Sequence, residues 1–458
     1  MRSAIALASL FLFVIASPFV VSAADGDGDG IDDTLDMCPY AAGTANSTLG
    51  NGCPDSNGDG LADFEQATTH DWSDSQRENL ETGYGGVEGI EWAKNDTMFY
   101  AAGSGGGWGG GSSNVTVHIF SSLGSPIGTL CVMPGSVNVI EQSPDESMIA
   151  IASDDGGAVV VNSTTGGLII DLYTDLFQLE NETENVISLS WSNDGTRLFL
   201  SSDENKISSV WTSNWTVEWN NFSLPGWVGG IDTTPDDRLL FASSGSLLTA
   251  FWVGNYTEAW NMTNHSQHIR VVTVSPDGRF LATGSDANRV VMTDIANNTK
   301  LAEIDVSSDA AGGVFSQDGG TFVIGSRRSS SLRTYETDTW SSLGTISGFG
   351  SSNNNRGIYS VDLNSNGERL AIGWRRGYVS LHIVAEGHVR VHGDFSSTLM
   401  EDSWRDWYYS TEDTVRVWDD NDRTTVTLEV CDGQDLLGSH TTGVSPEYAV
   451  KSANYSDT

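Results

Sequence analysis

One stretch of the chain decides the fold: Val271-Val272-Thr273-Val274-Ser275-Pro276-Asp277-Gly278-Arg279-Phe280-Leu281-Ala282-Thr283-Gly284-Ser285. An apolar run leads into a Ser-Pro-Asp-Gly turn, and a second apolar run follows and ends in small residues. This pattern predicts two antiparallel strands joined by a tight turn. Related copies recur at intervals of 41 to 50 residues, and their third turn residues, here called the turn anchors, are Asn95, Asp145, Asp194, Asp236, Asp277, Asp318 and Asn366.

A repeat of this length that holds several short strands is typical of the blades of a β-propeller. The fifth copy contains four apolar or alternating runs, over residues 269–274, 280–283, 290–295 and 301–306. One four-stranded sheet cannot bury both of its faces, whereas radial stacking buries each blade against its neighbours. We therefore predict an all-β protein with a seven-bladed propeller of four-stranded blades over residues 84–394. A two-sheet sandwich is the alternative.

The blades resemble those of the WD-repeat and YVTN-type propellers. The resemblance lies in the pattern, because Trp-Asp at the end of the third strand is mostly absent. Residues 395–458 contain further strand-like runs but lack the Pro-Asp-Gly turn. We expect a β-rich C-terminal extension there, with a mobile tail after Gly438. A degenerate eighth blade is the alternative.

The composition is strongly acidic, with 61 acidic residues, 22 basic residues and a net charge of −39. A carboxylate-dominated surface repels nucleic acid and anionic membranes, so we expect no nucleic-acid partner. An acidic shell is also what a salt-rich environment favours. The charge alone therefore identifies no ligand.

The first 23 residues have the features of a secretion signal. Arg2 provides the positive start, residues 4–21 are largely apolar, and Val21-Ser22-Ala23 forms a small-residue cleavage site. An uncleaved membrane anchor is the alternative, because the apolar stretch approaches spanning length. No other stretch of the sequence has that length and polarity. We expect a secreted or cell-surface protein without a transmembrane segment in its mature form.

Twelve Asn-X-Ser/Thr sequons fit an exported, glycosylated surface. A chain rich in Asn, Ser and Thr also generates such triplets by chance. The acceptor positions are Asn46, Asn95, Asn114, Asn162, Asn181, Asn214, Asn221, Asn255, Asn261, Asn264, Asn297 and Asn454.

Two Asp-rich loops follow the signal, and both place oxygen ligands with the spacing of a calcium loop. Such a loop uses positions 1, 3, 5, 7, 9 and 12, with the backbone carbonyl at position 7 and a glycine at position 6. In the first loop these positions are Asp25, Asp27, Asp29, Ile31, Asp33 and Asp36. In the second loop they are Asp55, Asn57, Asp59, Leu61, Asp63 and Gln66. Gln66 replaces the acid expected at position 12, and Glu65 lies one residue early, so we expect weaker binding there.

Asp-rich loops joined by Cys38-Pro39 and Cys53-Pro54 resemble the thrombospondin type 3 repeat, across residues 25–66 of a module spanning 24–70. That resemblance implies calcium as the ligand and a module in which calcium replaces a hydrophobic core. The segment has few apolar residues to bury, which agrees with ordering by metal and disulfide. A disordered acidic linker is the alternative.

Four cysteines in an exported chain favour disulfide pairing. Cys38 with Cys53 is the local pair and closes a short loop. Cys131 and Cys431 then remain. They either join the C-terminal region to the first blade or stay as two unpaired thiols.

Four arginines stand out against the acidic background. The turn between the second and third strands of each blade follows its anchor by nine and ten residues, and in two adjacent blades this turn holds Arg327, Arg328, Arg375 and Arg376. We expect these turns on one face of the disc. The arginines either pair with nearby carboxylates or receive an extracellular protein or an anionic glycan.

Enzyme motifs are weak. The glycine string at residues 105–110 precedes a strand, whereas a phosphate site needs a helix there. His388 and His392 lie too far apart on a strand to share a metal, and we expect His265 and His268 to be surface histidines. We therefore favour a calcium-binding interaction module over the alternative of a secreted propeller hydrolase or lyase. Acids or histidines lining the central channel would favour the enzyme.

Overall fold

The computed structural model describes most of the chain between residues 25 and 453. The described ranges are 25–67, 76–81, 85–104, 114–154, 157–172, 185–221, 224–329, 331–347, 357–365, 367–375, 377–383, 387–395, 400–409, 415–417, 425–432, 435–443 and 451–453. The signal segment, the glycine string and Arg376 lie outside these ranges. Among the described residues, no helix has the length and hydropathy needed to cross a membrane.

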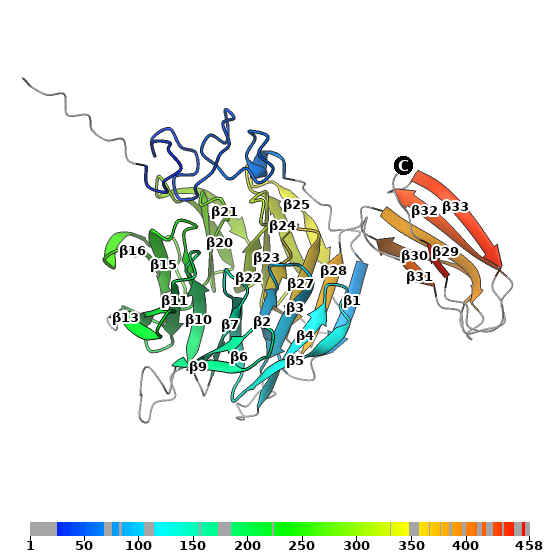
Figure 1. Cartoon of the computed structure of the whole chain (residues 1–458), viewed down its shortest axis with the longest axis horizontal. Coiled ribbons are helices and arrows are strands. Elements are labelled where there is room, and N and C mark those ends of the chain that lie inside the picture. The colour runs from blue at the N-terminus through cyan, green and yellow to red at the C-terminus, as the bar shows by residue number, and fades with distance from the viewer. Residues whose placement is uncertain are drawn as a thin grey trace, which may run out of the picture.

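Seven four-stranded antiparallel sheets form the propeller, as predicted (Figure 1). Blade 1 consists of β2 (Val87–Trp92), β3 (Met98–Gly103), β4 (Val115–Ser121) and β5 (Pro126–Met133). Blade 2 consists of β6 (Val137–Gln142), β7 (Met148–Ser153), β8 (Gly157–Asn162) and β9 (Leu168–Asp171). Blade 3 consists of β10 (Val186–Trp191), β11 (Arg197–Ser202), β12 (Ile207–Trp211) and β13 (Thr216–Asn221).

The next three blades follow the same order. Blade 4 consists of β14 (Ile231–Thr233), β15 (Leu239–Ser244), β16 (Leu247–Trp252) and β17 (Thr257–Met262). Blade 5 consists of β18 (Ile269–Val274), β19 (Phe280–Ser285), β20 (Arg289–Asp294) and β21 (Thr299–Asp305). Blade 6 consists of β22 (Ala310–Phe315), β23 (Thr321–Ser326), β24 (Ser331–Glu336) and β25 (Ser342–Ser347).

The anchor turns fold by local side-chain chemistry. In blade 5 the Asp277 carboxylate accepts hydrogen bonds from the Ser275 hydroxyl at 2.5 Å and from the Arg279 N–H at 3.0 Å. The following residue, Gly278, has φ +69°, which glycine adopts without strain. A Ser or Thr hydroxyl bonds to the anchor carboxylate in the same way at Asp145, Asp194, Asp236 and Asp318.

The core lies between neighbouring blades. Every residue of β15, β19 and β23 is buried, and the small residues of these second strands allow the sheets to approach closely. Four fully buried phenylalanines come from second strands: Phe99, Phe199, Phe241 and Phe322.

The seventh blade is completed from the other end of the chain. It consists of β26 (Ile358–Leu363), β27 (Arg369–Trp374) and β28 (Tyr378–Ile383), and its outer strand is β1 (Gln76–Glu81), which pairs antiparallel with β28. The predicted boundaries of 84–394 were therefore wrong at both ends. They excluded β1 and included the strand after residue 386, because a pairing between distant segments leaves no local pattern.

The C-terminal region forms its own sheet, in the order β30 (Met400–Tyr409), β29 (Gly387–Phe395), β32 (Thr425–Asp432) and β33 (Asp435–Gly443). β31 (Val415–Val417) pairs with β34 (Lys451–Ala453). In Figure 1 this sheet lies apart from the seven blades, so the described residues of this region add no eighth blade to the ring. The predicted mobile tail after Gly438 contains the end of β33, which pairs with β32, and all of β34, which pairs with β31.

The Asp-rich module, residues 25–67, precedes the propeller and has one short 3₁₀ helix, η1 (Asp63–Glu65). The predicted Cys38–Cys53 disulfide is present. It lies in a small buried cluster made of Cys38, Ala41, Ala45, Cys53, Ala62 and Phe64.

Candidate functional site

The first Asp-rich loop is folded around its own carboxylates. Asp25 accepts hydrogen bonds from the N–H groups of Gly28 at 2.8 Å and Gly30 at 3.1 Å. Asp29 accepts one from Ile31 at 2.8 Å. Carboxylate oxygens of Asp25, Asp27 and Asp29 lie within 4.8 Å of one another. The loop therefore gathers negative charge at one point.

The second loop repeats this geometry thirty residues later. Asp55 accepts hydrogen bonds from Gly58 at 2.7 Å and Gly60 at 2.9 Å, and Asp59 accepts one from Leu61 at 2.9 Å. The position-9 acids also match, since Asp33 binds the N–H of Gly26 and Asp63 binds that of Ser56. The glycines at positions 4 and 6 have positive φ in both loops: Gly28, Gly30, Gly58 and Gly60.

Asp36, at position 12 of the first loop, is buried at 7% exposure. One of its oxygens accepts a hydrogen bond from Cys38 at 2.7 Å, and the other, like one oxygen of Asp27, has no partner among the described residues. Burial, added to by the charges of nearby acids, raises the pKa of Asp36 to about 6. A buried carboxylate oxygen without a partner is costly. A cation among these acids would satisfy it, so the residues fit calcium.

The second loop differs at position 12. The Gln66 side-chain N–H donates to Asp59 at 2.9 Å, and the Asn57 amide donates to Gln66 at 3.0 Å. Glu65 is engaged elsewhere, because it accepts hydrogen bonds from Ser47 and from the N–H of Ala62. Weaker binding in this loop stays a prediction.

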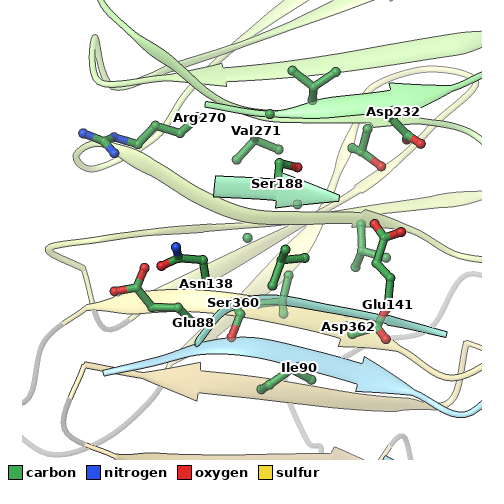
Figure 2. A pocket seen from close by; sticks show the side chains of 18 of the residues that line it. Glu88, Ile90, Asn138, Glu141, Ser188, Asp232, Arg270, Val271, Ser360 and Asp362 are labelled. Atoms are coloured by element: carbon green, nitrogen blue, oxygen red, sulfur yellow. The ribbon is translucent and has the colours of Figure 1, made fainter. Parts of the chain in front are cut away.

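A central cavity of about 290 Å³ is lined by the innermost strands of all seven blades. Figure 2 shows Glu88, Asn138 and Arg270 towards one end of this channel and Glu141, Asp232 and Asp362 towards the other. The lining is polar at both ends, with apolar residues such as Ile90 and Val271 between them.

Four acids occupy the same place in their blades, four residues before the turn anchor: Glu91, Glu141, Asp232 and Asp362. Each accepts a backbone N–H from the next blade. The donors are Gln142 at 3.0 Å, Trp191 at 3.2 Å, Val274 at 2.7 Å and Trp92 at 2.6 Å. The last of these bonds joins blade 7 to blade 1. These acids therefore link neighbouring blades.

Burial raises the pKa of all four of these interblade acids, which are called the channel acids below. The pKa of Asp232 rises to about 6, and those of Glu91, Glu141 and Asp362 also rise. This set of four acids was not predicted from the sequence. Its signal was an acid at the fourth residue before an anchor in four of the seven repeats.

The three described arginines of the predicted patch interact within the chain. Arg327 pairs with Glu88 at 3.5 Å and lies 4.9 Å from the ring centre of Tyr359. Arg328 pairs with Asp309 at 3.4 Å. Arg375 also has interactions inside the chain. Binding of an anionic partner here stays a prediction.

Two further predictions can be placed. Cys131 is a free thiol, which agrees with the alternative of unpaired cysteines, and burial raises its pKa to about 11. The side chain of Cys431 lies outside what the structure describes.

His265 is not a surface residue, contrary to the prediction. It is buried at 6% exposure between Ser285 at 2.8 Å and Thr283 at 2.9 Å, and burial lowers its pKa to about 4. His268 lies edge-on to Trp227.

Residues 257–294 match the family model described as WD domain, G-beta repeat. The matched segment begins with β17, the outer strand of blade 4, and ends with β20, the third strand of blade 5. The sequence repeat is therefore one strand out of phase with the blade. Together with the seven blades, the match supports a WD-repeat propeller, an architecture used for protein interaction. No curated protein matches the chain in sequence.

Proposed function

We propose that this chain is an exported, calcium-binding β-propeller that acts as an interaction module outside the cell or at its surface. The observation that carries the proposal is the duplicated loop, in which two segments thirty residues apart fold around the same ligand positions. The unsatisfied, buried oxygen of Asp36 supports it further.

In this proposal the first loop holds calcium through its side chains at positions 1, 3, 5, 9 and 12 and through the Ile31 carbonyl. The ion supplies the positive charge that these clustered acids otherwise lack. The chain's own part is to keep the oxygens together, through the glycine N–H groups and the disulfide. Six to eight oxygen ligands are typical of calcium.

Export is supported by the disulfide and by the placement of several sequons. Asn214, Asn255 and Asn297 are exposed and lie in the turns between the third and fourth strands of blades 3, 4 and 5. The partner we propose is an extracellular protein or an anionic glycan, held by the propeller.

Calorimetric titration of the full mature chain with CaCl₂ tests the proposal. We expect binding that Asp29→Ala weakens at least tenfold, because this acid lies at the centre of the converging oxygens. Asp59→Ala, in the second loop, should weaken the total calcium binding less. Asp305→Asn, an exposed acid on blade 5, is the matched control and should bind as the unmodified chain does. Absence of heat and of any spectral change on adding calcium would overturn the proposal.

The channel acids favour a second candidate, a secreted hydrolase or lyase, because paired carboxyl groups with raised pKa suit acid–base chemistry. Their bonds to the next blade give them a structural use that needs no substrate. Incubation with acidic polysaccharides, followed by measurement of new reducing ends and of unsaturated products, separates the two. Turnover that Glu141→Gln abolishes would replace the binding proposal.

A further inference from the structure

The Asp-rich module is docked on the turn face of three adjacent blades. Tyr40 packs against the apolar cluster between blades 4 and 5, and its carbonyl accepts a hydrogen bond from the N–H of Asp236 at 3.0 Å. Gly278 lies directly beneath it, since a Cβ there would be 3.1 Å from Tyr40 atoms. The contact therefore involves the anchor turns themselves.

Arg238 connects the first calcium loop to blade 4. Its guanidinium pairs with Asp236 of its own turn, donates to the Pro39 carbonyl and lies 4.6 Å from the ring centre of Tyr40. The same group is 3.6 Å from Asp33, the position-9 acid of the loop. It also fills the space beside Gly26, where a Cβ would collide with the guanidinium.

Arg279 makes the corresponding contact on blade 5. Its guanidinium lies 3.4 Å from the ring centre of Phe64 and pairs with Asp277 at 2.7 Å. Phe64 follows Asp63, the position-9 acid of the second loop, in η1. Each calcium loop is thus contacted by one arginine of the propeller, at position 9 in the first loop and at the next residue, Phe64, in the second.

These arginines occupy the same turn position, two residues after the anchor. On blade 6 that position is Gly320, where a side chain would collide with Ala67. The other four blades carry no arginine there and have Thr97, Ser147, Thr196 and Glu368. The sequence of the turns therefore marks blades 4, 5 and 6 as the footprint of the module.

We propose that calcium occupancy of the module is coupled to its docking on blades 4–6 through Arg238 and Arg279. This inference rests on the proposed function. Calcium orders the loops that present Tyr40 and Phe64, so loaded loops dock and empty loops release the anchor turns. By linkage, docking must raise calcium affinity by the same factor.

Two effects of calcium oppose each other at Arg238. The ion lowers the negative charge of the loop and weakens its attraction to the arginine. That pair is partly exposed, at 27% and 29% for Arg238 and Asp33, and contributes little. Ordering the module, whose core consists of three alanines, the two disulfide cysteines and Phe64, is the larger effect. Calcium therefore promotes docking.

Calcium titration combined with hydrogen exchange of the full chain tests the coupling. We expect calcium to slow amide exchange in the turns at residues 234–239 and 275–280. Arg238→Ala should lower calcium affinity about tenfold, within the usual range of coupling, and remove this protection. Gly26→Ala should do the same without altering any ligand side chain, because its methyl group displaces the arginine.

Arg289→Ala is the matched control, since this arginine of blade 5 pairs only with Glu303 and Asp305 among the described acids. Arg289→Ala should change neither the calcium affinity nor the amide exchange of the two turns. Calcium binding with unchanged exchange in the turns, or unchanged affinity in both variants, would overturn this inference alone. Absence of calcium binding to the unmodified chain would overturn the proposed function and this inference together.

Discussion

Both the propeller and the Asp-rich module bury carboxylates, and they treat them differently. Each channel acid of the propeller accepts an N–H from the next blade, as Asp362 does from Trp92 at 2.6 Å. In the module, Asp27 and Asp36 each keep a buried oxygen without a partner among the described residues. The described part of the propeller thus satisfies its buried acids internally, whereas the module leaves two buried acid oxygens without a protein partner.

The apolar residues show the same contrast. The propeller buries large side chains between its blades, including Phe99 and Phe199, both fully buried. The module exposes Leu35 at 70% and Leu49 at 65% and buries mainly alanines and its disulfide. Hydrophobic burial orders the propeller, whereas the module has its disulfide and, in our proposal, calcium.

The largest effect is expected where the propeller's own closure is broken. A chain that begins at residue 85 lacks both the module and β1, whereas a chain that begins at residue 76 lacks only the module. Six residue pairs join β1 to β28, and at about 1 kcal/mol of hydrogen bonding for each pair their loss costs roughly 6 kcal/mol. Calorimetric unfolding should show a much lower, less cooperative transition for the shorter chain. Equal transitions would show that the ring closes without β1.

A smaller effect, confined to the module, should follow loss of its disulfide. Replacing both Cys38 and Cys53 with Ser removes a link across 15 residues, which is worth about 3 kcal/mol. We expect rapid proteolysis within residues 25–67 and weakened calcium binding, with the propeller transition unchanged. Cys131→Ala, which removes the free thiol of blade 1, is the control. A lowered propeller transition in the disulfide variant would contradict the separation of the two regions.

The smallest effect concerns pH. The folded-state pKa of Asp232 is raised to about 6, so between pH 4 and 6 the folded protein holds a proton that the unfolded chain has lost. The stabilisation that this bound proton gives the folded state is fully present below about pH 4 and is lost as the pH rises through 6. Asp232→Asn should remove roughly 1–2 kcal/mol of the fall in stability between pH 5 and pH 8. Denaturant unfolding in saturating calcium measures this, and parallel pH profiles for the two proteins would disprove it.

Local chemistry explains what was predictable. The anchor carboxylates bond to residues two positions away, so each turn is specified by a few adjacent residues, and seven copies indicate seven blades. The calcium-loop spacing and the Cys38–Cys53 pair are equally local. The fold class and the number of blades therefore follow from the sequence alone.

Contacts between distant residues decided the rest. Sequence by itself determined the blades and the candidate ligand positions, because turns and loops depend on neighbours within a dozen residues. Only the tertiary structure decided that β1 completes blade 7 and that Asp362 accepts a hydrogen bond from the N–H of Trp92, 270 positions away. The same holds for the contact of Arg238 with Asp33 of the module. The physical reason is that ring closure and docking join surfaces whose complementarity exists only after the blades have stacked.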